Sequence, residues 1–205
     1  MSHTAVENPW PARRPACALF VGGVRSGKSG FAQRWAEARA PRRLYVATCA
    51  AADAEMAERV RLHRAARGPE WACLEVPLDV PEALDALWAG PGPDADAATA
   101  GVVLLDCVSM WIANLLGAGL DDVAALARVE ALAASLERRT LPVAVVTAET
   151  GLGLVPPSPL GRRFLDVLGL ANQRLAGLAE PVVLAVCGLA LALRGPLPEE
   201  LELRP

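Results

Sequence analysis

Lysine and histidine are scarce in this chain of 205 residues. Lys28 is the only lysine, so every other basic residue except the histidines His3 and His63 is an arginine. Arginine is a poor substitute where a compact and mobile ammonium charge is needed, because its guanidinium group is planar and bulkier. The one lysine therefore marks a candidate functional position.

Closely spaced cysteine pairs are absent as well. The five cysteines lie far apart and include no Cys-x-x-Cys spacing: Cys17, Cys49, Cys73, Cys107 and Cys187. An odd number of scattered thiols argues against a disulfide framework and against a zinc site. This pattern favours a reduced, cytoplasmic protein.

Long apolar segments and an excess of basic residues are also missing. The longest apolar run, residues 181–193, is shorter than the ~20 residues that cross a bilayer, and residues 1–14 lack the apolar region of a signal peptide. We therefore expect no membrane span. The formal net charge is −3 and the sequence pI is about 5.5, so we do not expect nucleic acid as a partner.

The composition is that of a folded domain. Hydrophobic residues make up 53% of the chain, and the mean hydropathy is +0.30. A chain of this length buries roughly 70% of its surface, which is enough for one well-formed core. We expect a disordered lead-in at residues 1–15, a single nucleotide-binding domain at 16–195, and a flexible acidic tail at 196–205.

Apolar segments alternate with segments of helical pattern. We expect strands at residues 16–21, 43–48, 71–76, 101–106, 142–147 and 181–186, and helices at 28–39, 53–66, 80–88, 108–116, 121–139 and 160–178. Strands that are apolar throughout indicate a parallel sheet with both faces covered. We predict an α/β fold with three layers, in which helices cover both faces of a mostly parallel sheet.

A phosphate-binding loop follows the first apolar segment. The run Gly22-Gly23-Val24-Arg25-Ser26-Gly27-Lys28-Ser29 matches the pattern G-x-x-x-x-G-K-[ST]. Glycines let backbone N–H groups surround phosphate oxygens, and the helix that follows directs its positive end at the same anion. In this pattern, Lys28 reaches the β- and γ-phosphates and Ser29 binds Mg²⁺. The match uses the only lysine, which disfavours a chance occurrence.

A second acidic residue is needed near the metal ion, and Asp106 ends the apolar segment Val102–Leu105. A carboxylate at the end of a buried strand is typical of the magnesium site in such enzymes. The alternative is an ordinary carboxylate that caps the next helix.

The absence of a guanine-binding motif narrows the class of nucleotide-binding protein. A regulatory GTPase needs Asn-Lys-x-Asp to bind guanine, and Lys28 cannot supply it. The D-x-x-G run at Asp166–Gly169 lies within a helical pattern and is accidental. A small-molecule kinase or nucleotidyltransferase fits best.

Seven segments, in order, resemble one enzyme family. They are GGVRSGKS (22–29), LYVAT (44–48), EMAERVRLHR (55–64), WACLEVP (71–77), LLDCVSMWIANLL (104–116), ETGLGLVP (149–156) and NQRLA (172–176). The chain is similar to the bifunctional adenosylcobinamide kinase / adenosylcobinamide-phosphate guanylyltransferases of cobalamin biosynthesis. The resemblance implies a RecA-like sheet, a homotrimer, Mg²⁺, and ATP or GTP as phosphoryl donor. The substrates it implies are adenosylcobinamide, its phosphate, and GTP.

The resemblance also implies site residues. The guanylylated histidine falls on His63, since the run from Glu55 to Arg59 fixes the register. The nucleotide contacts fall on Gly22–Ser29 and on Ala47, Thr48, Cys49, Arg64, Ala65, Ala66, Arg67, Glu75 and Asp106. Glu75 is equally well interpreted as a solvent-facing strand residue.

The residues around His63 support a role as nucleophile. A neutral imidazole can attack the α-phosphorus of a nucleotide, and the arginines at 59, 61, 64 and 67 suit a triphosphate and favour the neutral ring. The alternative is a packed histidine, because Met56, Val60 and His63 share one helical face. His63 then belongs to a kinase of one activity, or to a nucleotide-binding module without catalysis.

Three features depart from the family or stay open. The family pattern N-E-V-G is Ala148-Glu149-Thr150-Gly151 here, and the histidine that often precedes the nucleophile is Leu62. The Gly- and Pro-rich loop at residues 150–159 either gates the corrinoid site or only turns the chain.

Overall fold

Seven strands form one sheet in the computed structural model, which describes residues 14–49, 68–90 and 99–202. Their order across the sheet is β3-β2-β4-β5-β1-β6-β7, and every neighbouring pair is parallel except β6 and β7. The strands are β1 (Cys17–Gly22), β2 (Arg43–Ala47), β3 (Trp71–Glu75), β4 (Val103–Asp106), β5 (Val143–Ala148), β6 (Val182–Val186) and β7 (Leu189–Arg194).

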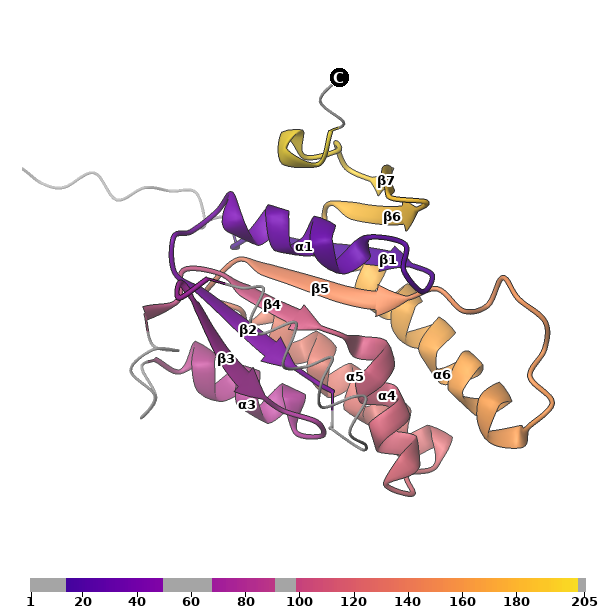
Figure 1. The fold of residues 1–205 in the computed structure, drawn as a ribbon. Coiled ribbons are helices and arrows are strands. Elements are labelled where there is room, and N and C mark those ends of the chain that lie inside the picture. Colours follow the sequence, from indigo (N-terminus) through magenta and orange to yellow (C-terminus); the bar gives the residue numbers. More distant parts are fainter. Residues whose placement is uncertain (1–13, 50–67, 91–98, 203–205) are drawn as a thin grey trace, which may run out of the picture.

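Helices cover both faces of this sheet (Figure 1). One face carries α1 (Lys28–Glu37) and the short 3-10 helix η2 (Glu199–Leu201). The opposite face carries α3 (Val80–Trp88), α4 (Val108–Gly117), α5 (Asp122–Glu137) and α6 (Pro159–Ala176). The prediction of an α/β fold with three layers and a mostly parallel sheet is confirmed.

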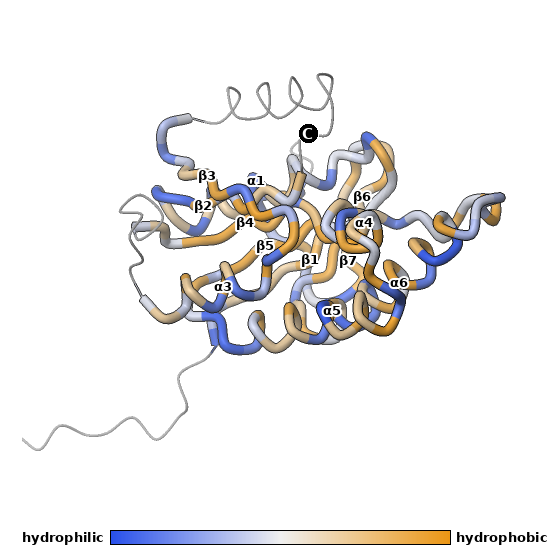
Figure 2. The backbone as a smooth tube through the Cα atoms, turned by 90° about the horizontal axis from the view of Figure 1, so that it is seen from below, coloured by the Kyte–Doolittle hydropathy of each residue, from blue (hydrophilic) through white to orange (hydrophobic). Residues whose placement is uncertain are grey.

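The two covered faces explain why the strands are apolar at every position. In β1, Leu19 and Val21 pack into the core under α3–α6, whereas Ala18 and Phe20 pack under α1. In Figure 2 the central strands are coloured as hydrophobic and lie in the interior of the molecule, whereas hydrophilic segments lie at its periphery. Within the described residues, no helix is both long and apolar enough to span a bilayer.

One strand was not predicted. We expected residues 181–186 to form the last strand, but a tight turn reverses the chain and β7 pairs antiparallel with β6. Cys187 and Gly188 make that turn with φ values of 53° and 77°, the positive φ values that a two-residue hairpin requires. The sequence hides the turn because apolar residues continue through it.

The C-terminal segment packs against α1. Leu201 is buried, and Glu200 Oε1 accepts a hydrogen bond of 2.6 Å from Arg39 Nη1. The Arg39 guanidinium also stacks 3.5 Å from the ring centre of the buried Trp35. Part of the segment that we expected to be flexible thus has defined contacts. The predicted helix at 53–66 lies outside the described residues.

Candidate active site

The loop between β1 and α1 has the backbone conformation of a phosphate-binding loop. Arg25 and Gly27 have positive φ values of 56° and 96°, which turn the chain back toward the start of α1. No side chain caps this helix end, and its first turn holds no acidic residue. Its N–H groups are therefore available to an anion.

Two residues of the loop show how tightly it is built. A Cβ atom at Gly22 would lie 2.5 Å from the Ala185 carbonyl oxygen and 2.6 Å from Ser26 Oγ, so no larger residue fits without a shift. Ser26 Oγ is buried and has no hydrogen-bond partner among the described residues. A buried hydroxyl without a partner is costly, and a bound phosphate could satisfy it. The loop therefore fits a nucleotide phosphate.

Lys28 extends across this loop. Its Nζ donates a hydrogen bond of 3.1 Å to the carbonyl oxygen of Gly23. Lys28 is half-buried, and its hydrogen bond to Gly23 is exposed, so its charge is accessible to a phosphate in the loop. Ser29 follows in the first turn of α1 and is also partly buried.

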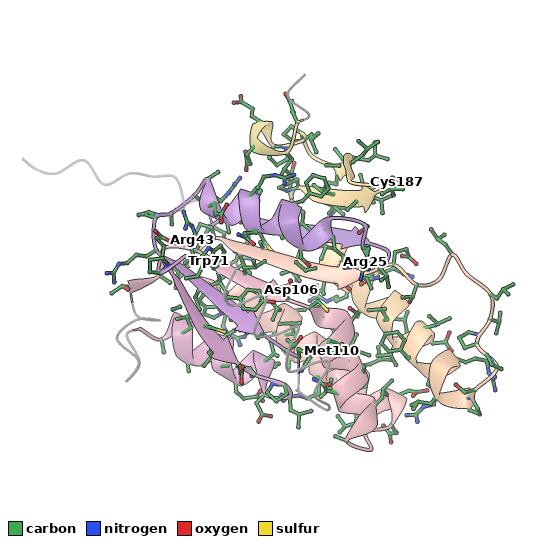
Figure 3. The ribbon with its side chains drawn as sticks, viewed as in Figure 1. Arg25, Arg43, Trp71, Asp106, Met110 and Cys187 are labelled. Atoms are coloured by element: carbon green, nitrogen blue, oxygen red, sulfur yellow. The ribbon has the colours of Figure 1, made fainter. Side chains whose placement is uncertain are left out.

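Asp106 ends β4 at the same edge of the sheet. Strand β5 separates β4 from β1, and the labelled Asp106 and Arg25 both lie toward this edge in Figure 3, whereas Arg43 and Trp71 lie at the opposite one. Burial raises the pKa of the neighbouring Cys107 thiol. The Asp106 carboxylate adds to that rise and Lys28 opposes it. Lys28 and Asp106 are thus both close enough to the Cys107 thiol to affect its pKa.

The donor set suits Mg²⁺ better than a metal held by protein groups alone. Ser29 and Asp106 carry side-chain oxygens at this edge, and the described residues include no group of three His, Cys, Asp or Glu side chains able to hold a metal. Magnesium keeps several waters and binds through one or two protein oxygens together with substrate phosphates. The residues present therefore fit Mg²⁺ bound with a nucleotide.

The predicted contacts from β2 and β3 lie beside Asp106. In the sheet register, Ala47 is paired with Asp106 on one side and with Glu75 on the other. Ala47 and Thr48 are buried, Cys49 is half-buried and Glu75 is exposed. The structure thus brings these residues to one edge of the sheet.

Thr48 joins the ends of β2 and β4. Its Oγ1 donates a hydrogen bond of 2.8 Å to the Cys107 carbonyl oxygen and accepts one of 2.9 Å from the Cys107 N–H. From α4, Asn114 Nδ2 donates to the carbonyl oxygens of Thr48 (2.7 Å) and Pro77 (3.0 Å). These bonds fix the backbone directly after Asp106, after β2 and after β3.

Glu149 is a site candidate that sequence reasoning missed. It follows β5, the strand between the phosphate loop and Asp106, and its N–H donates a hydrogen bond of 3.2 Å to the Gly22 carbonyl oxygen. Its Oε1 accepts from the Gly151 N–H at 2.7 Å. The signal was present, because Glu149 follows an apolar strand closely, as Asp106 ends one.

The Ala148 position, where the family pattern has asparagine, is held by its backbone. Asn172 of α6 donates from Nδ2 to the Ala148 carbonyl oxygen at 3.0 Å and accepts from Thr147 Oγ1 at 2.7 Å. The end of β5 is therefore fixed without an amide side chain at position 148.

The predicted nucleophile and its neighbours are not placed. His63, Arg64, Ala65, Ala66 and Arg67 lie outside the described residues. Their roles stay predictions.

Comparison with known proteins adds a family match. The model of the family described as cobinamide kinase / cobinamide phosphate guanyltransferase matches residues 18–193. The chain is 39% identical over 178 residues to the bifunctional adenosylcobalamin biosynthesis protein CobP of Pseudomonas aeruginosa, covering 86% of this chain and 96% of that protein. It is 37% identical over 191 residues to the protein CobU of Salmonella typhimurium, covering 86% and 98%.

Among solved structures, one match is a KaiC-like protein from Pyrococcus horikoshii. The TM-score is 0.46 and the identity is 15%, over 82% of this chain and 70% of that one.

Proposed function

The chain belongs to the cobinamide kinase / cobinamide phosphate guanyltransferase family, and on that premise we propose that it phosphorylates adenosylcobinamide and then guanylylates the product. The observation that carries the proposal is the placement of Lys28, Ser29 and Asp106 at one edge of the sheet, within a family match that covers residues 18–193. ATP or GTP serves as phosphoryl donor, and GTP as guanylyl donor.

In the first step, the hydroxyl of adenosylcobinamide attacks the γ-phosphorus of the nucleotide, and the nucleoside diphosphate leaves in line. Lys28 and the N–H groups of the phosphate loop bind the β- and γ-phosphates and stabilise their charge. Ser29 and Asp106 would hold Mg²⁺, which would supply further neutralisation of the phosphate charge. Glu149 would accept the proton that the hydroxyl loses.

In the second step, a nitrogen of His63 attacks the α-phosphorus of GTP and pyrophosphate leaves. The product is a guanylyl-histidine with a P–N bond. An oxygen of adenosylcobinamide phosphate then attacks the same phosphorus, which breaks the P–N bond and releases adenosylcobinamide-GDP. Arg64 and Arg67 neutralise the charge of the leaving pyrophosphate.

The proposal extends to the setting of the enzyme. Scattered thiols favour the cytoplasm, and the family resemblance implies a homotrimer. The proposed reactions involve no nucleic acid.

The experiment follows both reactions separately in the full chain. The protein is incubated with adenosylcobinamide and MgGTP, with or without MgATP, and chromatography separates adenosylcobinamide phosphate from adenosylcobinamide-GDP. We expect both products from the parent and only the first from His63→Ala. Formation of the phosphate alone by the parent would indicate a kinase of one activity, and nucleotide binding without either product would indicate a module without catalysis.

A further inference from the structure

The connection between β5 and α6 exposes three large apolar side chains. Leu152, Leu154 and Val155 are 89%, 96% and 77% exposed. In Figure 1 this connection extends well beyond the end of β5 before it returns to α6. Single exposed apolar residues are ordinary on protein surfaces, but a run of them on one loop marks a binding surface.

Hydrogen bonds within the connection hold it at both ends. At its start, Glu149 Oε1 accepts from the Gly151 N–H. At its end, Arg162 Nη1 donates to the carbonyl oxygens of Pro156 (3.1 Å) and Pro157 (2.8 Å), and Ser158 Oγ accepts from the Gly161 N–H at 3.1 Å. The apolar segment 152–155 is therefore presented to solvent by an anchored loop.

The connection begins at the phosphate loop. The Glu149 N–H donates to the Gly22 carbonyl oxygen, and Val24 in the phosphate loop is itself 85% exposed. Apolar side chains thus occur both in the loop that binds phosphate and in the segment that leaves it. A ligand on this surface would be bulky and apolar and would carry a group that reaches the γ-phosphate.

We propose that residues 152–155, together with Val24, bind the corrin macrocycle of the acceptor substrate. This inference rests on the proposed function. The hydroxyl that is phosphorylated lies at the end of a side arm of adenosylcobinamide, so the macrocycle must lie beside the phosphate site and not within it. The apolar face of that ring is the chemistry that Leu152, Leu154 and Val155 would recognise.

A second copy of this chain is the competing occupant. A stable protein interface buries ~800 Å² on each partner and involves roughly 20–30 residues of each. Four side chains do not supply that area. The connection also begins beside the phosphate loop, through the hydrogen bond from the Glu149 N–H to the Gly22 carbonyl oxygen, and the second substrate must meet the nucleotide there. These two observations favour the substrate over a subunit.

The test uses the full chain with the double substitution Leu152→Ser and Leu154→Ser. We expect the KM for adenosylcobinamide to rise by about tenfold or more, which corresponds to at least ~1.4 kcal/mol. The KM for GTP and the rate at which GTP alone labels the protein should stay within about twofold of the parent. Leu170→Ser is the matched control, since Leu170 is exposed on α6 outside the connection.

Each outcome separates the hypotheses. An active parent whose double variant keeps the parent's KM for adenosylcobinamide would refute the inference alone. A double variant that changes oligomeric state in sedimentation, together with its KM, would assign the surface to a second copy and overturn the inference. A parent that does not phosphorylate adenosylcobinamide would refute the proposed function, and the inference would fall with it.

Discussion

Replacement of Thr48 by valine tests how the ends of β2 and β4 are joined. Valine has nearly the shape of threonine, and Thr48 is fully buried, so the change removes the hydroxyl with little change in packing. The Cys107 N–H and carbonyl oxygen would both lose their bonds to Oγ1. The Cys107 carbonyl oxygen still accepts a hydrogen bond of 3.1 Å from the Trp111 N–H, so only the Cys107 N–H is left without a partner. An unpaired buried polar group costs about 1–3 kcal/mol, and we expect the free energy of unfolding to fall by that amount.

The assay is urea denaturation followed by tryptophan fluorescence, with the kinase rate measured on the same preparation. Because Cys107 follows Asp106, we expect kcat/KM for phosphoryl transfer to fall by at least about tenfold, the equivalent of ~1.4 kcal/mol. Thr48→Ser is the control: it keeps the hydroxyl and should lose only about 1 kcal/mol for the missing methyl group. If the valine variant is as stable and as active as the parent, this hydroxyl does not join the strands. The same conclusion follows if Thr48→Ser loses as much stability and activity as Thr48→Val.

Three further predictions concern charge and thiols. Lys28→Ala should lower both activities by roughly 10³-fold in a protein that still melts cooperatively, and Lys28→Arg should also be impaired. Near-normal turnover by Lys28→Ala would contradict the assignment of the phosphate loop. Glu149→Gln keeps an acceptor for the Gly151 N–H but removes the carboxylate that accepts a proton. It should lower phosphoryl transfer by about 10²–10⁴-fold and leave labelling by GTP intact. Equal loss of both would indicate a structural role for Glu149. Burial raises the pKa of Cys17 to about 11, so the folded state holds that proton more tightly than the unfolded chain does. The free energy of unfolding should therefore decline as the pH rises from about 9 toward 11, and it should decline less in Cys17→Ala.

The apolar strands could be predicted because both faces of the sheet are covered. Leu19 and Phe20 point to opposite cores, so neither position tolerates a polar residue, and the whole segment is recognisable. The same rule hides β7. Leu189, Leu191 and Leu193 continue the apolar composition of β6 although their side chains are exposed, so composition does not reveal where the chain reverses. The turn at Cys187 and Gly188 depends on backbone conformation that only glycine signals, and weakly.

The site divides in the same way. Gly22–Ser29 are contiguous, and their spacing alone predicts a phosphate loop. Glu149 had a weak signal in the sequence, its place just after an apolar strand, but only the strand order shows that this strand lies beside the phosphate loop. Asn114 had no such signal. Strand β5 lies between β1 and β4 only after a crossover, which brings Glu149 next to Gly22. Asn114 matters because its side chain bonds the backbone that follows β2 and β3.

Intact mass measurement after incubation with MgGTP, followed by peptide mapping, tests the two-step mechanism most directly. The parent protein should gain one GMP, and the modified peptide should carry it on His63. The adduct should disappear when adenosylcobinamide phosphate is added, with release of adenosylcobinamide-GDP, and it should not form in His63→Ala. Guanylyl transfer by the parent without any GMP adduct, or an adduct that still forms in His63→Ala, would contradict the mechanism.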